Sequence, residues 1–321
     1  MGPPEQGSGG YCWVVKTTFK MLIIYHSADL DGICSGAILH KRFPDARLLG
    51  YDYRDPFDVE ENIENDERVI MADVSMPMDV MEQIAQRSGM FRWIDHHPSA
   101  HKDFMEHFGS EVMVHQDGGM SVLDGDLKYI YEEGRAACEL CWEFVSDDPI
   151  PEPVILLGKY DTWRGNGTPE WDNRILPFQY GMRVGGYTPE SLADWWLRDM
   201  EYTEEKVGKR ISIGEGILKY QKQQDERLML KSFDARLNVP GEPIRCLVCN
   251  GAYNSTAFES KWDESKYDIM AGISYDGKMW GVSLRTTKDI DLSVIAKSFG
   301  GGGHKKAAGC GVDDLRKIFV W

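Results

Sequence analysis

The sequence predicts an α/β protein with a doubly wound parallel sheet first, a helical connector next, and a smaller α/β domain with a mixed sheet at the C-terminal end. Two observations predict this order. Apolar runs typical of buried strands alternate with helical patterns through the first half, as in the β-α-β units of parallel sheets. From residue 233 onward, strand patterns follow one another and two of them flank a hairpin turn. A chain of 321 residues can build two domains.

We place the domain limits by composition. Residues 1–20 are rich in Gly and Pro at their start and lack the pattern of a secretory signal, so we expect a disordered leader or an expression tag there. The first α/β domain is expected over 21–186, the connector over 187–232 and the second domain over 233–321. Residues 164–186, rich in Gly, Asn and Pro, are interpreted as a loop.

The individual elements follow from apolar spacing and from Gly and Pro positions. In the first domain, strands are predicted at 21–25, 46–51, 68–72 and 91–94, and helices at 33–40, 77–87 and 136–145. The connector carries apolar residues at helical spacing, and we interpret its Trp195 and Trp196 as packing residues. In the second domain, strands are predicted at 244–249, 268–274 and 278–284, a turn at 275–278 and a helix at 291–298.

Polar residues follow four apolar segments at the point where each segment ends. They are His26, Asp29 and Asp31 after the first, Asp73 after the second, Asp95, His96 and His97 after the third, and Asp161 after 154–160. In a parallel sheet the carboxyl ends of the strands meet at one edge, where ligands bind. Imidazole and carboxylate together suit manganese, zinc, iron or cobalt. For Asp29 a structural alternative is open, because Asp is a common helix N-cap.

These segments resemble the DHH phosphoesterase superfamily. His-x-x-Asp-x-Asp-Gly at 26–32, Asp-His-His at 95–97 and Tyr-Asp-Thr-Trp at 160–163 occur in that family's order. Phe-Gly-Gly-Gly-Gly-His at 299–304, with Ala-Ala-Gly at 307–309, is similar to the signature of the DHH-associated C-terminal domain. The resemblance covers roughly 21–312. One departure is the spacing of two residues between the first His and the first Asp, where pyrophosphatases and several nanoRNases have three.

The resemblance implies a site for two divalent metal ions. Manganese is expected, with magnesium, cobalt or zinc as alternatives. One ion would be held by His26, Asp29 and Asp73, and the other by Asp31, Asp73, His96 and Asp161, so that Asp73 is a bridging and catalytic residue. A hydroxide held between the ions would attack phosphorus in line. His97 would hydrogen-bond or protonate the leaving group, and Asp95 would orient a neighbouring histidine.

The second domain is expected to bind the substrate. Ser283 and Arg285 match the family's substrate-contacting strand, and a guanidinium can bind phosphate bidentately. The glycines after 299 are interpreted as a loop whose backbone N–H groups approach an anion closely. The resemblance assigns the terminal phosphate or nucleotide end to Gly301, Gly302, Gly303 and His304.

Charge and cysteine content narrow the class of substrate and the compartment. The net charge of −16 disfavours a protein that coats long duplex nucleic acid or acts as a processive RecJ-like nuclease. Residues 233–321 carry 12 basic and 11 acidic side chains, whereas the remainder carries 24 and 41, so a phosphate-bearing substrate fits the second domain better. The seven cysteines favour a reducing, cytoplasmic compartment, and we interpret them as buried small hydrophobic residues. No apolar run is long enough to span a membrane.

The preferred interpretation is a metal-dependent phosphodiesterase that releases mononucleotides from short oligonucleotides or dinucleotides, with a homodimer as an open alternative to a monomer. Three other activities within the family are alternatives. They are a small-nucleotide phosphatase, a cyclic-dinucleotide phosphodiesterase and an exopolyphosphatase. Aromatic residues such as Tyr253 or Phe258 lining the substrate cleft would favour bases as ligands. A non-catalytic nucleotide-binding module is the alternative of another class.

Overall fold

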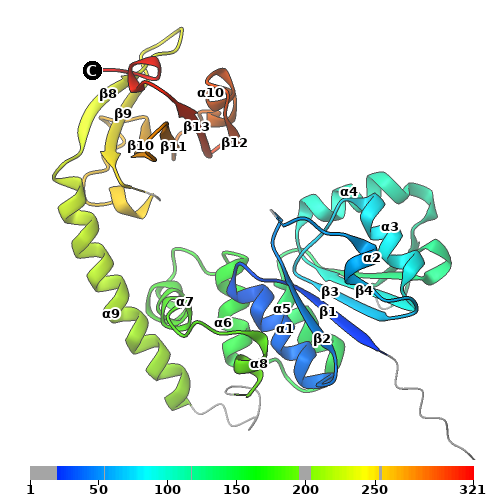
Figure 1. Ribbon diagram of the computed structural model, residues 1–321. Coiled ribbons are helices and arrows are strands. Elements are labelled where there is room, and N and C mark those ends of the chain that lie inside the picture. The colour runs from blue at the N-terminus through cyan, green and yellow to red at the C-terminus, as the bar shows by residue number, and fades with distance from the viewer. Residues whose placement is uncertain (1–19, 54, 117, 195–203, 253–254) are drawn as a thin grey trace, which may run out of the picture. The chain divides into compact units, whose positions relative to one another are not determined.

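The computed structural model describes residues 20–53, 55–116, 118–194, 204–252 and 255–321 (Figure 1). The chain divides into two compact units, Met1–Glu215 and Gly216–Trp321, and each is described by itself. All of the predicted leader except Lys20 lies outside the described residues, as do Trp195, Trp196 and Tyr253. The limits proposed for the domains from composition remain predictions.

The first unit is built on a seven-stranded sheet in the order β2-β1-β3-β4-β7-β6-β5. Its strands are β1 (Met21–His26), β2 (Arg47–Tyr51), β3 (Arg68–Ala72), β4 (Met90–Asp95), β5 (Met113–Val114), β6 (Met120–Val122) and β7 (Leu127–Tyr131). The first five in this order are parallel, as predicted. The short strands β6 and β5 extend one edge antiparallel, which the sequence analysis did not predict.

Helices cover both faces of this sheet, so the prediction of a doubly wound fold is confirmed (Figure 1). One face packs against α1 (Leu30–Arg42), α5 (Ala137–Val145), α6 (Glu152–Asp161), α7 (Leu176–Arg183) and α8 (Pro189–Leu192). The other packs against α2 (Val59–Asn62), α3 (Met78–Arg87) and α4 (Pro98–Phe108). Alternation along β1 sends Ile23 into the first core and Leu22 and Ile24 into the second.

The interpretation of residues 164–186 as a loop was wrong. A π-helical turn over Trp171–Ile175 runs directly into α7. Trp171, Ile175, Phe178 and Met182 are buried at spacings of three and four residues, which is a helical stripe that the Gly, Asn and Pro content concealed. Pro177, which has no backbone N–H to donate, lies where the π-helical turn passes into α7.

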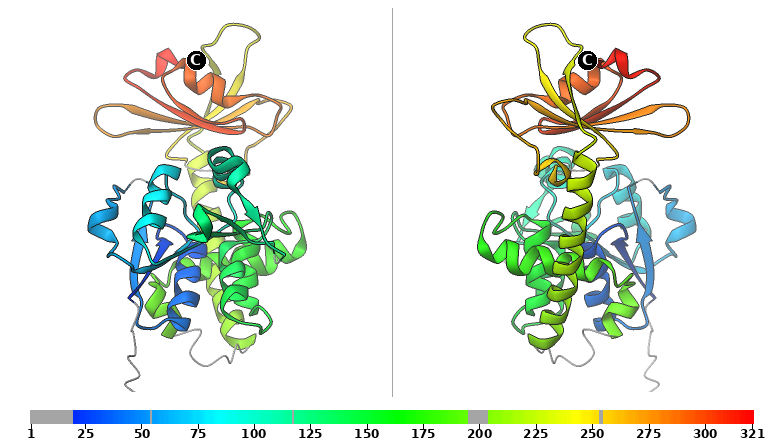
Figure 2. Two further views of the ribbon diagram at one scale, coloured as in Figure 1. Left: turned by 90° about the vertical axis from the view of Figure 1, so that its right-hand side faces the viewer. Right: turned by 90° about the vertical axis from the view of Figure 1, so that its left-hand side faces the viewer.

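The second unit contains a mixed seven-stranded sheet with α10 (Leu292–Ser298) packed against it, as predicted (Figure 2). The strand order is β12-β13-β11-β10-β9-β8-β14, and β9 and β10 are its parallel pair. The strands are β8 (Phe233–Leu237), β9 (Arg245–Asn250), β10 (Ile269–Tyr275), β11 (Trp280–Arg285), β12 (Gly302–His304), β13 (Ala307–Val312) and β14 (Phe319–Val320). Gly277, at φ 97°, forms the predicted hairpin turn between β10 and β11.

The six cysteines that the structure describes are free, and five of them are buried. Cys246 and Cys249 belong to separate apolar clusters on the two faces of β9, as their spacing in a strand predicted. In the described part of the chain, no helix has the length and apolar character needed to cross a bilayer.

The long helix α9 (Glu204–Met229) crosses α7 so closely that only glycine fits at the contact. A Cβ on Gly214 would lie 1.7 Å from the carbonyl oxygen of Pro177, and one on Gly181 would lie 1.9 Å from that of Arg210. By contrast, nothing lies within 4 Å of a Cβ on Gly208, earlier in the same helix. Gly208 and Gly214 therefore differ in packing but share the same helical backbone.

We expect Gly214→Ala to lower the free energy of unfolding by about 1–3 kcal/mol, because the added methyl overpacks the contact with α7. The matched variant Gly208→Ala should raise it by about 1 kcal/mol, because alanine is the better helix former. Urea unfolding followed by circular dichroism measures both. Equal responses of the two variants would show that α9 does not cross α7 at this point.

Candidate active site

The turn between β1 and α1 brings His26 and Asp29 together. Asp29 caps α1, since its Oδ1 accepts a hydrogen bond from the Gly32 N–H at 3.0 Å. Its Oδ2 lies 3.0 Å from His26 Nδ1, so the capping residue also faces the site. A Cβ on Gly32 would lie 2.1 Å from the His26 carbonyl oxygen, which explains why glycine ends the motif.

Asp31 is buried, with 3% exposure, and the start of α5 holds its carboxylate. The Ala137 N–H donates to Oδ2 at 3.0 Å and the Cys138 N–H donates to Oδ1 at 2.9 Å. These are N-terminal amides of a helix, which stabilise a negative charge through the helix dipole. A carboxylate of α1 is thereby fixed by a helix more than a hundred residues later in the chain.

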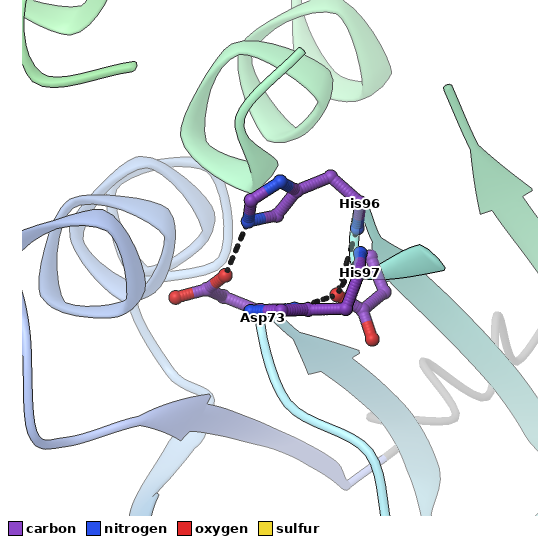
Figure 3. Close-up of side chains that lie close together, drawn as sticks. Asp73, His96 and His97 are labelled. Atoms are coloured by element: carbon purple, nitrogen blue, oxygen red, sulfur yellow. Dashed lines mark hydrogen bonds and ion pairs between the residues drawn. The ribbon is translucent and has the colours of Figure 1, made fainter. Parts of the chain in front are cut away.

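Asp73 lies at the centre of the site, directly after β3. Its backbone has a left-handed φ of 61°, and its N–H donates to the Ile94 carbonyl of β4 at 3.0 Å. Its side chain is 1% exposed. Oδ1 lies 3.3 Å from His96 Nε2 (Figure 3). Oδ2 lies 3.6 Å from His26 Nδ1. One carboxylate thus faces two imidazoles that come from different strands.

His96 joins the remaining carboxylates to this centre. Its Nε2 lies 3.5 Å from Asp31 Oδ2 and 3.2 Å from Asp161 Oδ2, at the C-terminal end of α6. The predicted metal-ligating residues therefore fall into two sets. The first set is His26 and Asp29, and the second is Asp31, His96 and Asp161. Asp73 has one oxygen towards each set.

His97 points to a different partner. Its Nδ1 lies 2.7 Å from Asp95 Oδ1, and the same oxygen accepts hydrogen bonds from the backbone N–H groups of His96 and His97. Asp95 is fully buried at the end of β4. This pairing fixes the orientation of the His97 ring and assigns Nδ1 the proton, which leaves Nε2 at the far side of the ring.

The crowding of carboxylates changes the pKa values of the imidazoles. The nearby carboxylate of Asp29, and next that of Asp73, raises the pKa of His26 to about 10. Burial lowers the pKa of His96, but the carboxylates of Asp161 and Asp73 outweigh burial and raise it to about 11. Without a metal, both rings are therefore held as cations by the surrounding negative charge.

The donor set fits divalent metal ions. Within the described chain, both oxygens of Asp73 and Nε2 of His96 are buried and make no hydrogen bond of acceptable geometry. Burial, and next the negative charge of Asp73, raises the pKa of Asp31 well above its usual range. Buried polar atoms without partners and uncompensated carboxylates are costly, and a cation bound among them removes both costs. Mixed imidazole and carboxylate ligands suit manganese or another transition metal.

The predicted substrate residues of the second unit share one face of its sheet. Ser283 and Arg285 are two residues apart on β11, so their side chains point to the same face of the sheet. Directly paired residues of neighbouring strands also point to the same side. Two rows result, Arg285–Ala307–His304 and Ser283–Gly309–Gly302. Arg285 Nη1 donates to Ser283 Oγ at 3.0 Å. In both rows the middle strand, β13, contributes a small residue, Ala307 or Gly309. The polar side chains of β11 therefore lie on one side of it, and His304 of β12 lies on the other.

The interpretation of the whole glycine run as a loop was wrong, whereas its role in binding a phosphate of the substrate stays a prediction. Gly302–His304 is strand β12, and the Gly301 N–H donates to the Ala296 carbonyl at the end of α10. A Cβ on Gly301 would lie 2.1 Å from the Gly309 carbonyl oxygen, and one on Gly303 would lie 2.6 Å from Ala308 Cα. These glycines are required for close pairing of β12 with β13. The local sequence alone does not distinguish such a strand from a glycine-rich loop.

The sequence analysis missed two residues that support the site. Glu139, 3% exposed in α5, pairs with Arg164 and accepts a hydrogen bond from the Ala136 N–H at 3.1 Å. Their contact joins the helix that holds Asp31 to the turn that follows Asp161. Of the aromatic residues proposed for the substrate cleft, Phe258 is instead buried in a core cluster.

The chain is similar to several known proteins. Residues 257–318 match the model of the DHHA1 domain. The chain is 27% identical over 263 residues to uncharacterized protein R106 of Acanthamoeba polyphaga mimivirus, covering 77% of this chain and 54% of that protein. It is 26% identical over 286 residues to oligoribonuclease NrnB of Bacillus subtilis, covering 82% of this chain and 60% of that protein. The chain thus spans somewhat more than half the length of these curated relatives.

Among solved structures, the chain is similar to a pGpG-specific phosphodiesterase, PggH, from Vibrio cholerae. The TM-score is 0.51 at 11% sequence identity, and the alignment covers 92% of this chain and 93% of that one. This likeness shows a shared fold.

Manganese should stabilise the protein against thermal unfolding, and Asp73→Asn should abolish the effect. At a manganese concentration 100 times Kd, binding to the folded state contributes about 2.7 kcal/mol. Asn has the size of Asp and tolerates a left-handed backbone. The matched control is Asp124→Asn, which removes the same charge at an exposed residue with φ 53°. The assignment fails if the manganese-dependent shift in Tm survives in Asp73→Asn or disappears in Asp124→Asn.

Proposed function

We propose that this chain, a member of the DHH phosphoesterase superfamily, is a metal-dependent phosphodiesterase that hydrolyses short oligonucleotides or dinucleotides to mononucleotides. One observation carries the proposal. The buried carboxylate of Asp73 has one oxygen towards His26 and the other towards His96, each of which faces further carboxylates. A carboxylate between two donor sets is the usual arrangement for cleavage of phosphoesters with two metal ions.

The side chains of the two donor sets have separate tasks. His26, Asp29 and Asp73 would hold one ion, and Asp73 with the residues around His96 would hold the other. Two divalent ions, when bound, lower the pKa of water and stabilise charge on the phosphoryl oxygens. The α5 amides fix Asp31 before any ligand arrives, so the chain spends little energy on reorganising the site.

His97 is proposed to protonate the leaving oxygen. Its Nδ1 is committed to Asp95 at 2.7 Å, which keeps the ring oriented and stabilises the imidazolium form. The Asp95 carboxylate counteracts the effect of burial and raises the pKa of His97. A cationic ring with a free Nε2 is a suitable general acid near neutral pH.

Arg285 and the polar groups around it are proposed to bind a phosphate of the substrate. The guanidinium is half-buried on β11, where Ser283 Oγ and the Leu284 carbonyl fix its position. Burial of part of the side chain strengthens its attraction for an anion, and the fork geometry permits two parallel hydrogen bonds. A short substrate suits the acidic balance of the whole chain.

Other phosphate esters on the same site are the second candidate. Metal-dependent phosphatases, cyclic-dinucleotide phosphodiesterases and exopolyphosphatases need the same donor sets, so the ligands alone do not choose among them. The name of the Bacillus subtilis relative, oligoribonuclease NrnB, supports oligoribonucleotides. The complete donor set argues against a non-catalytic module. The free, buried cysteines support the cytoplasm as the compartment.

A substrate panel with manganese tests the proposal. It contains 5′-labelled RNA of about two to twenty nucleotides, matching DNA, cyclic dinucleotides, a nucleotide bisphosphate and polyphosphate. We expect the shortest RNA to be cleaved with the highest kcat/KM. Cleavage of polyphosphate alone, or of a cyclic dinucleotide alone, would contradict the proposed substrate and leave the metal centre in place.

His97→Gln should lower kcat for a dinucleotide by about 10²–10⁴-fold, the usual contribution of a general acid. The loss should be far smaller for thymidine 5′-p-nitrophenyl phosphate, because p-nitrophenolate leaves without protonation. The matched control is His107→Gln. His107 lies near the other end of α4 and pairs with Glu82, so this variant should behave as the wild type. An equal loss of kcat on both substrates would show that His97 does not act as the acid.

A further inference from the structure

The turn that follows α6 holds a tryptophan in an unusual conformation. Trp163 has a left-handed φ of 57°, and its side chain is 66% exposed. Bulky side chains rarely adopt this backbone conformation, because the Cβ crowds the following carbonyl. Exposure of so large an apolar side chain is also unfavourable. Neither backbone geometry nor core packing explains why a tryptophan occupies this position. Two unfavourable features at one residue therefore indicate a functional role.

The indole of Trp163 rests on a stack of rings. Its ring centroid lies 5.5 Å from that of Trp171, with the planes inclined by 17°. Trp171 is buried and stacks in turn on Tyr160, at 5.6 Å and 9°. The inner face of Trp163 is therefore backed by two near-parallel rings. The stack holds the indole plane in place before any ligand binds.

Hydrogen bonds fix the turn that carries this indole. The Trp163 N–H donates to the Tyr160 carbonyl at 3.2 Å, and Thr162 Oγ1 donates to the Gly158 carbonyl at 2.7 Å. Arg164 donates from Nε to Thr162 Oγ1 at 2.8 Å and pairs with the buried Glu139. The exposed tryptophan thus sits on a rigid turn, in contrast to the aromatic residue of a mobile loop.

This platform lies next to the metal centre. Trp163 follows Asp161 by two residues, so their Cα atoms are at most about 7 Å apart. Asp161 Oδ2 is 3.2 Å from His96 Nε2. We propose that Trp163 is the stacking surface for a nucleobase of the substrate, on the nucleoside joined to the phosphate that reacts at this centre. The proposal rests on the function proposed above and names the chemical class that the site prefers.

The platform selects among the phosphate esters that the metal centre alone would accept. A flat indole offers a nucleobase a stacking contact that is independent of base identity. The indole makes no comparable contact with polyphosphate, because polyphosphate has no ring and its charged oxygens would lose hydration against an apolar surface. A site with this platform therefore prefers nucleotide substrates and tolerates different bases.

The test compares two substrates in two variants of Trp163. One substrate is a diadenosine dinucleotide with a 5′-phosphate, and the other has the same sugar–phosphate backbone without bases. Trp163→Gly removes the ring and is favoured at positive φ, so the turn keeps its conformation. Trp163→Phe keeps an aromatic plane. Trp321→Ala is the matched control, because Trp321 is 62% exposed and belongs to the other unit.

In Trp163→Gly, we expect kcat/KM for the dinucleotide to fall by about 5- to 150-fold, as for the loss of one base–aromatic stack, mainly through KM. Trp163→Phe should retain most of the wild-type value, and the abasic substrate should be cleaved equally by all variants. An equal fall on the abasic substrate would overturn the proposal and make Trp163 a support for Asp161. Unchanged kcat/KM for the dinucleotide in Trp163→Gly would overturn it as well.

A second measurement needs no turnover. The wild-type protein with manganese is irradiated with 4-thiouridine 5′-monophosphate, and the cross-linked peptide is identified by mass spectrometry. We expect cross-links to the peptide that contains Trp163 and their loss in Trp163→Gly. Cross-links that persist in Trp163→Gly would refute the stacking contact. If the wild type cross-links normally but cleaves no oligonucleotide, the proposed reaction fails while the base-binding surface stands.

Discussion

The buried negative charge at the carboxyl edge of the first sheet is the constraint on which the rest of the structure depends. Asp29, Asp31, Asp73 and Asp161 lie around two imidazoles, and Asp31 and Asp73 are almost fully removed from solvent. Burial raises the pKa of both buried carboxyls because a low-dielectric surrounding disfavours their charged form. Protons on the imidazoles offset part of this cost. Two divalent cations would offset it more fully, which is why this arrangement is suited to metal-dependent chemistry and poorly suited to a purely structural role.

The fold holds these charges in place through backbone groups, so that the site does not depend on flexible side chains alone. The first amides of α5 bind Asp31, the Gly32 amide binds Asp29, and the Ile94 carbonyl holds the backbone of Asp73 in its left-handed conformation. The ion pair of Arg164 with the buried Glu139 then links α5 to the turn after α6. Asp161 ends α6 and Trp163 lies in this turn, so one short segment would position a metal ligand and a surface for the base.

Much of the site could be predicted from the sequence, because most of the ligands follow an apolar strand whose direction in a parallel sheet is known. Asp161 is different, since it ends helix α6. The order of these segments, together with the spacing of the His26–Gly32 and Asp95–His97 motifs, was sufficient to show the resemblance to the DHH phosphoesterase superfamily. Contacts between distant segments could not be predicted. Nothing near Asp31 in the chain indicates that Ala137 and Cys138 bind its carboxylate. Residues 164–186 misled because Gly, Asn and Pro indicate loops on average, whereas the spacing of Trp171, Ile175 and Phe178 indicates a helix. The run at Gly300–Gly303 was interpreted as a loop but continues into strand β12, because glycine permits close strand pairing as well as loops.

The number and position of metal ions test the central claim most directly. Crystals of the protein soaked in manganese, measured at the manganese absorption edge, would show each ion by its anomalous scattering. We expect two peaks about 3.5–4 Å apart with the Asp73 carboxylate between them. A single peak away from Asp73, or ions bound elsewhere with none between His26 and His96, would contradict it.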